Sequence, residues 1–99
     1  MRLTAEEARR RLAAARVAYL ATVRPTGEPH VVPIVFALEA DRLYSIADPK
    51  PKDGPDLLRF RNIRANPAVS LLTDAYDEDW DRLWWVRVDG SARMVEDGP

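Results

Sequence analysis

The segment that most constrains the fold is residues 57–72, LLRFRNIRANPAVSLL, in which a basic helical pattern gives way to an apolar run. The apolar positions of the first half recur at helical spacing: Leu57, Phe60 and Ile63. Pro67 disfavours the helical conformation at the residue before it, so we expect the helix to end at Asn66-Pro67. Residues 68–73 are too short a run for a typical helix and predict a buried or half-buried strand.

Polar side chains flank the apolar stripe of this helix. Arg59 and Asn62 lie on one flank, and Arg61 and Arg64 lie on the other. Lys50 and Lys52 precede the helix in a proline-rich loop, residues 48–55. Cations gathered around a helix start suit a phosphate-bearing ligand. A solvated surface helix explains the same charges, and on chemistry alone it is the more common case.

Composition places the chain among single-domain soluble proteins. Its 99 residues include 46% apolar residues, and no run approaches the roughly 20 apolar residues of a membrane span. The N-terminal sequence lacks the apolar segment of a secretory signal. The absence of cysteine removes disulfide and thiol chemistry. These features fit a cytoplasmic protein.

Charge is distributed unevenly along the chain. Residues 1–66 contain 12 Lys or Arg and 8 Asp or Glu, whereas residues 67–99 contain 3 and 8. A general nucleic-acid binder needs cations that dominate one continuous surface. The asymmetry therefore argues against that class and favours a local anionic ligand.

The N-terminal half predicts one helix and three strands. Thr4 and Glu7 have the spacing of a capping box, and the helix that they begin runs to about Ala15. Strands are predicted at residues 17–23, 29–38 and 43–47. Pro33 lies inside the second strand and cannot donate to a ladder. It therefore implies an edge, a bulge, or backbone left free to face a ligand.

The C-terminal half predicts an acidic loop at residues 74–81 and a long strand at residues 83–95. Asp89-Gly90 interrupts this strand, as either a bulge or a hairpin turn. Five strands with one helix before them and one between them predict a small antiparallel barrel.

Several kinds of site are not indicated. His30 is the only histidine, and the sequence does not cluster the other ligands of a metal site. The acidic loop lacks the glycine and terminal glutamate of a calcium-binding EF-hand. No serine–histidine–acid set is evident. We therefore predict no metal and no catalytic side chain.

Five ordered segments between Val17 and Val95 resemble the split β-barrel flavin and deazaflavin superfamily, the pyridoxamine 5′-phosphate oxidase-like group. They are ATVRPTGEPHVVPIVF, LYSIAD, K-x-K, LLRFRNIRANPAVSLL and DEDWDRLWWVRVDGSARMV. Within this group the chain is most similar to the actinobacterial branch of F420-dependent enzymes. The resemblance implies a mainly β, Greek-key-like antiparallel split barrel of the FMN-binding type. It also implies an N-terminal helix, and one short helix between the third and fourth strands.

The resemblance further implies that residues 1–99 form a single domain that lacks the C-terminal helix and closing strand usual in the family. The cofactor-binding residues that it implies are Val32, Pro33, Ile34, Ser45, Lys50, Lys52, Arg59, Asn62 and Trp85. In the family the second strand lies along the cofactor ring, and the third strand supplies a small hydroxyl residue.

The family's phosphate-binding Ser-x-Lys signature falls on Arg59, which keeps the charge and offers bidentate geometry. Leu57 stands where the signature has serine, so Lys50 and Lys52 are candidates for the missing contact or for the acidic tail of a deazaflavin.

The resemblance makes Trp84, Trp85 and Arg87 candidates for a wall of the site contributed by a partner subunit. Adjacent strand residues face opposite sides, so at least one of the two tryptophans belongs to the core or to an interface.

The resemblance, with the lysine-bearing loop, implies an F420-dependent oxidoreductase that acts on an unknown organic substrate. The resemblance implies a homodimer with the cofactor at its interface, with no nucleic acid and no membrane as partner. FMN is the alternative cofactor. A non-enzymatic cofactor-binding or haem-binding barrel is an alternative of a different class, because one fold can host many functions.

Overall fold

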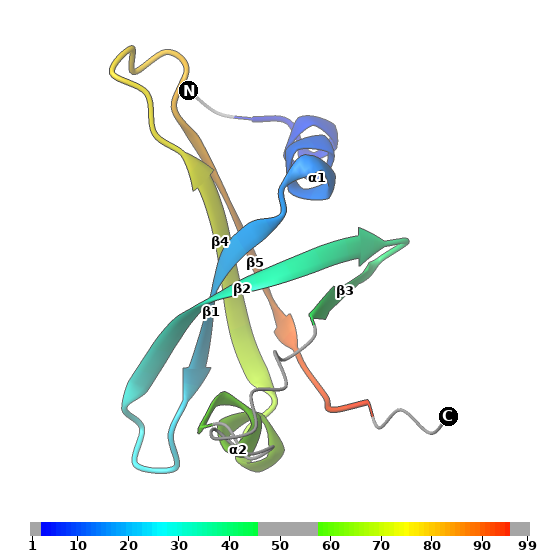
Figure 1. The fold of residues 1–99 in the computed structure, drawn as a ribbon, viewed down its shortest axis with the longest axis vertical. Helices are drawn as coiled ribbons and strands as arrows, with labels where there is room; N and C mark the ends of the chain where they lie inside the picture. The colour runs from blue at the N-terminus through cyan, green and yellow to red at the C-terminus, as the bar shows by residue number, and fades with distance from the viewer. Residues whose placement is uncertain (1–2, 46–57, 96–99) are drawn as a thin grey trace.

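The computed structural model describes residues 3–45 and 58–95. Figure 1 shows a strongly curled antiparallel sheet, with the two helices at different ends of it. The elements in chain order are α1 (Ala5–Ala14), β1 (Val17–Val23), β2 (Pro29–Glu39), β3 (Arg42–Ser45), α2 (Leu58–Ala65), β4 (Ala68–Ala75) and β5 (Trp84–Ser91). None of the helices in these ranges is long and apolar enough to cross a membrane.

The five strands form one sheet in the order β3-β2-β1-β4-β5, and all neighbours are antiparallel. The first three strands follow each other as a meander, and β4 returns to lie beside β1. This is the Greek-key order. Within the described ranges β3 and β5 are the two edges of the sheet, so the sheet does not close on itself. It is therefore a curled half-barrel. The predicted mainly β split-barrel class is confirmed.

Both helices begin or end where the sequence predicts. The Thr4 hydroxyl accepts a hydrogen bond from the Glu7 backbone N–H at 3.1 Å, and the Glu7 carboxylate accepts one from the Thr4 backbone N–H at 3.3 Å. This is a complete capping box. At the other helix, α2 ends just before Asn66 and Pro67.

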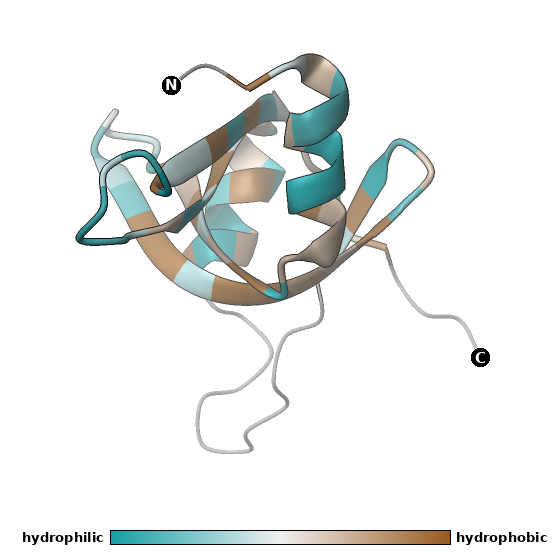
Figure 2. Ribbon diagram, turned by 90° about the horizontal axis from the view of Figure 1, so that it is seen from above, coloured by the Kyte–Doolittle hydropathy of each residue, from teal (hydrophilic) through white to brown (hydrophobic). Residues whose placement is uncertain are grey.

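The core occupies the concave inner face of the sheet. Its buried residues are Leu12, Ala18, Ile34, Phe36, Leu71 and Val86. The helix α1 contacts β2 and β5, and so covers the inner face between two strands that are not neighbours in the sheet. Figure 2 shows largely hydrophobic strands curled around this interior, with hydrophilic residues along the helix surface.

The expected interruption at Asp89-Gly90 is wrong. The strand β5 continues through both residues, and Gly90 pairs with Val69 in an unbroken register. The Ser70 hydroxyl donates to the Asp89 carboxylate at 2.7 Å from the paired strand. Asp89 is therefore satisfied across the ladder, and neither a bulge nor a hairpin turn forms there. The strand ends at Ser91.

Within the described residues, the part of β2 that contains Pro33 has one neighbouring strand, which fits an edge, one of the three settings that its sequence position allows. Among the described residues, β3 pairs with residues 36–39 of β2, and the preceding part of β2 pairs with β1. The Phe36 N–H donates to the carbonyl of Arg16, the residue just before β1. Hydrogen-bonded and non-hydrogen-bonded pairs alternate, so the nitrogen of Pro33 points away from β1. Its missing N–H removes no ladder bond.

Candidate functional site

A buried hydrogen bond anchors α2 to the sheet. The Asn62 amide donates to the Thr22 hydroxyl at 3.0 Å, and each residue is 1% exposed. Thr22 lies directly opposite His30 in the β1–β2 ladder. The bond therefore places α2 beside the hairpin end of β2. Sequence reasoning identified Asn62 as a cofactor residue, but the partner Thr22 was missed.

The inner face near this bond also contains two buried polar atoms that have no hydrogen-bond partner among the described residues, His30 Nδ1 and Asn62 Oδ1. His30 and Thr22 are cross-strand neighbours, so their side chains share this face. His30 thus faces the interior of the half-barrel rather than the outer surface.

The three arginines of α2 differ in exposure. Arg59 is partly buried, and its guanidinium lies 5.1 Å from the centroid of the Phe60 ring. Arg61 and Arg64 are exposed, and each makes a further interaction within the chain. The helix has no acidic residue. It therefore presents a concentration of positive charge at the hairpin end of β1, which α2 contacts.

The three β2 residues that the resemblance implicates face two directions. Ile34 is a buried core residue, and Val32 packs against the core. Pro33 is exposed on the outer face. A ligand on the outer face would therefore meet the side chain of Pro33 but only the backbone of its two neighbours.

Ser45 is the last described residue of β3 and lies opposite Phe36 of β2. Its hydroxyl donates to the Val35 carbonyl at 2.8 Å, and the side chain is exposed. Ser45 therefore holds the end of the described part of β3 against β2.

The adjacent tryptophans take opposite faces, as predicted. Trp84 packs against the core, and the Arg11 guanidinium lies 5.1 Å from its ring centroid. Trp85 is 60% exposed on the outer face, opposite Asp74 in the β4–β5 ladder. Arg87 also lies on that face and pairs with Asp89 at 3.3 Å.

The outer face of the sheet is more apolar than a solvent-facing surface needs to be. Its exposed apolar residues are Val17, Tyr19, Val31, Pro33, Val35, Leu72 and Trp85, which we call the outer row. Ladder pairing makes most of them direct neighbours, since Tyr19 lies opposite both Pro33 and Leu72. A contiguous exposed apolar patch marks a surface that binds something. The apolar residues at alternate positions of the strands were the available signal for this patch.

Two residues of the expected site, Lys50 and Lys52, lie outside the described residues, as does Leu57, which stands where the family signature has serine. Two open hollows lie beside α1, and neither is lined by a predicted cofactor residue. The described residues contain no group of three or more potential metal ligands.

The curled five-stranded half-barrel defines a protein of the pyridoxamine 5′-phosphate oxidase-like split-barrel class, a flavin-binding superfamily. The family model described as pyridoxamine 5′-phosphate oxidase matches residues 4–99. The chain therefore belongs to this family.

Solved structures of similar proteins have the same fold. A FAD-binding protein from Mesorhizobium loti is 33% identical with a TM-score of 0.74, over 96% of this chain and 62% of that one. An F420 reductase is 32% identical with a TM-score of 0.59, over 87% of this chain and 59% of that one. A haem-binding protein from Mycobacterium smegmatis is 25% identical with a TM-score of 0.70, over 98% of this chain and 39% of that one. The chain thus spans less than two thirds of each. No curated protein matches it.

Proposed function

We propose that the protein is an F420-dependent oxidoreductase, which binds the deazaflavin in preference to FMN and reduces or oxidises an organic substrate by hydride transfer. The observation that carries this proposal is the position of α2. Its arginines lie on a helix that Asn62 and Thr22 anchor at the hairpin end of β1, and the outer surface of the adjoining strand β2 is apolar. This arrangement combines positive charge, which binds a phosphate, with an apolar surface, which binds a planar ring.

The residues present fit such a group. A planar ring can lie against the outer face near Pro33, where, within the described part of the chain, β2 pairs on one side only, with β1. Arg59 provides a charge-assisted, bidentate donor for a phosphate. Lys50 and Lys52 are proposed to extend this anionic subsite toward a longer acidic tail.

When bound, the cofactor supplies the hydride chemistry itself. The contribution of this chain is to bind, to orient and to exclude water. The outer row removes solvent from one face of the ring, while Arg59 fixes the opposite, anionic end of the molecule. We assign no catalytic side chain.

We further propose that the site is shared by two copies of the chain. The outer row is exposed in one copy, and two of the predicted cofactor positions, Pro33 and Trp85, lie on this exposed face. A second copy that packs on this face would bury the row and enclose the ring. Trp85 and Arg87 are proposed to contribute to the wall of the partner's site.

The test is a parallel titration of the purified protein with F420 and with FMN, followed by fluorescence. Selective F420 binding is expected, and it would justify a substrate screen with the reduced cofactor. Selective FMN binding would move the protein to the flavin branch. A Soret band with added haem and no binding of either ring would identify a haem-binding barrel instead.

A further inference from the structure

His30 is a partly buried titratable residue that the proposed function does not use. Of its two ring nitrogens, Nδ1 is the one that is buried without a hydrogen-bond partner among the described residues. The residue as a whole is partly exposed, so Nε2 can be hydrated at the surface. A buried polar atom without a partner is costly, and native proteins rarely contain one. Nδ1 therefore requires a hydrogen-bond partner inside the half-barrel.

Two other polar groups lie next to this nitrogen. Asn62 Oδ1 is the second buried atom without a partner among the described residues. The amide nitrogen of Asn62 donates to the Thr22 hydroxyl at 3.0 Å. Thr22 lies directly opposite His30 in the β1–β2 ladder, which places their Cβ atoms about 5 Å apart on the same face. The two unpartnered atoms therefore both lie beside the Thr22 hydroxyl.

The three groups together match the hydrogen-bonding capacity of one water molecule. The Thr22 hydroxyl accepts from Asn62 and still has its own proton to donate. Asn62 Oδ1 accepts, and His30 Nδ1 accepts when the ring proton is on Nε2. A water that accepts from Thr22 and donates to the other two has three partners, the usual number for a buried water. No direct bond joins His30 to Asn62 in the described part of the chain, so a bridging molecule is needed.

We propose that His30 is a positioning residue for α2, joined to Asn62 and Thr22 through one internal water molecule. The water fixes the Asn62 amide in the orientation that donates to Thr22, and this bond anchors α2 to the sheet. Arg59 lies three residues before Asn62, on the same flank of the helix. The network therefore fixes the position of Arg59. Its effect on cofactor binding rests on the proposed function, whereas the network itself does not.

A double-mutant cycle in the absence of ligand tests the network. His30→Phe keeps a ring of similar size but removes both nitrogens, and it is expected to lower the folding equilibrium constant about fivefold. In the Asn62→Leu background the same change is expected to lower it by less than about twofold, because the network is already broken. His30→Asn is expected to recover most of the loss, since its amide can occupy the position of Nδ1. Urea denaturation measures all of these variants.

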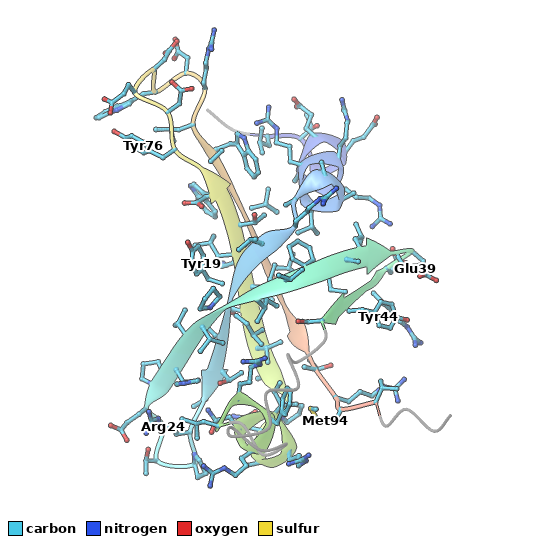
Figure 3. The ribbon with its side chains drawn as sticks, viewed as in Figure 1. Tyr19, Arg24, Glu39, Tyr44, Tyr76 and Met94 are labelled. Atoms are coloured by element: carbon cyan, nitrogen blue, oxygen red, sulfur yellow. The ribbon has the colours of Figure 1, made fainter. Side chains whose placement is uncertain are left out.

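Thr73→Val is the matched control. Thr73 is 3% exposed, and its hydroxyl donates to a backbone carbonyl at the start of β1 at 3.0 Å. Figure 3 shows Tyr76, three residues beyond Thr73, at the opposite end of the ribbon from Arg24, two residues beyond Thr22. The control thus removes a buried hydrogen bond of the inner face outside the network. Its effect on stability is expected to add to that of Asn62→Leu.

Ligand titration tests whether the network acts through Arg59. The two ligands are F420 and the deazaflavin nucleoside that lacks its phosphate. His30→Phe is expected to weaken F420 binding about fivefold and to leave the affinity for the nucleoside unchanged, because only the anionic end of F420 meets Arg59. His30→Asn is expected to bind F420 as the wild type does. Circular dichroism confirms that each variant is folded before the titration.

Three results would overturn the proposal. Additive losses of stability for His30→Phe and Asn62→Leu would show that the two side chains are not connected. Equal losses of affinity for the two deazaflavins would rule out positioning of Arg59. His30 is the only histidine, so a ¹⁵N spectrum reads its ring directly, and a neutral ring with its proton on Nδ1 would contradict the bridging water. A wild type that binds neither ligand would contradict the proposed function, and the ligand-free cycle would then decide the network alone.

Discussion

The inner and outer faces of this sheet differ in how their apolar residues are used. On the inner face, Ile34, Phe36 and Leu71 are buried by the chain's own helices and curvature. On the outer face, residues of the same kind remain exposed, and Val35 is 67% exposed. The two faces alternate along the same strands. The chain therefore stabilises itself with one face and, in our account, reserves the other for cofactor and partner.

The largest expected effect is the loss of stability when an apolar residue of the inner face is shortened. The same change on the outer face is expected to have little effect. Leu71→Ala is expected to lower the free energy of unfolding by about 2 to 4 kcal/mol, because the buried side chain leaves a cavity. Val35→Ala, on the outer face of β2, is the matched control and is expected to change monomer stability by less than about 0.5 kcal/mol. Urea denaturation at low protein concentration measures both. Equal losses of stability in the two variants would show that both faces stabilise the single chain, which contradicts this account.

The next effect concerns the cations beside the outer face. Arg59→Ala is expected to weaken F420 binding by roughly 1.5 to 3 kcal/mol, because a charge-assisted contact to phosphate is lost. Arg42→Ala, an exposed arginine on β3, is the control and should leave the affinity unchanged. Fluorescence titration gives both dissociation constants. An unchanged affinity for the Arg59 variant would rule out its phosphate role, even with the fold intact.

A third prediction sharpens the distinction between anchoring and ligand contact. Asn62→Leu removes the buried bond to Thr22 and is expected to cost about 1 to 3 kcal/mol of stability, since a buried hydroxyl loses its partner. Thr22→Val should cost a similar amount, and the double variant less than the sum of both. Thermal denaturation of the three variants completes the cycle. Additive losses would mean that the two side chains act independently.

The smallest effect on stability is expected at the start of α1, the helix that covers the inner face. The hydrogen bonds from the Thr4 backbone and hydroxyl hold the pKa of the Glu7 carboxyl below its usual value. The contribution of the Glu7 carboxylate to folding stability is therefore present at neutral pH. It is lost as the pH falls through that lowered pKa. Thr4→Ala is expected to cost about 1 kcal/mol at neutral pH. The difference between the wild type and this variant should shrink in acid, as measured by denaturation at several pH values.

The sequence was sufficient for features that local rules decide. The capping box at Thr4 and Glu7 defined the start of α1, and Pro67 defined the end of α2. Strand alternation placed Trp84 and Trp85 on opposite faces. The family resemblance then supplied the Greek-key order, which no local pattern contains.

Features decided by distant partners could not be predicted in this way. Asp89 stays in a regular strand because Ser70, 19 positions away, donates to it. Asn62 is buried because Thr22, 40 positions away, accepts its hydrogen bond. The helical pattern showed a polar flank at Asn62, but it could not show which flank the sheet would cover.

Concentration-dependent sedimentation of wild type and Val35→Asp, with F420 titration of the same samples, tests the role of the outer face most directly. The variant places a charge in the outer row, opposite Val17 in the β1–β2 ladder, without disturbing the inner core. Our account predicts a wild-type dimer that binds F420, and a folded monomeric variant whose binding is strongly weakened. A monomeric wild type that binds F420 tightly, or a variant that matches the wild type in both measurements, would contradict it.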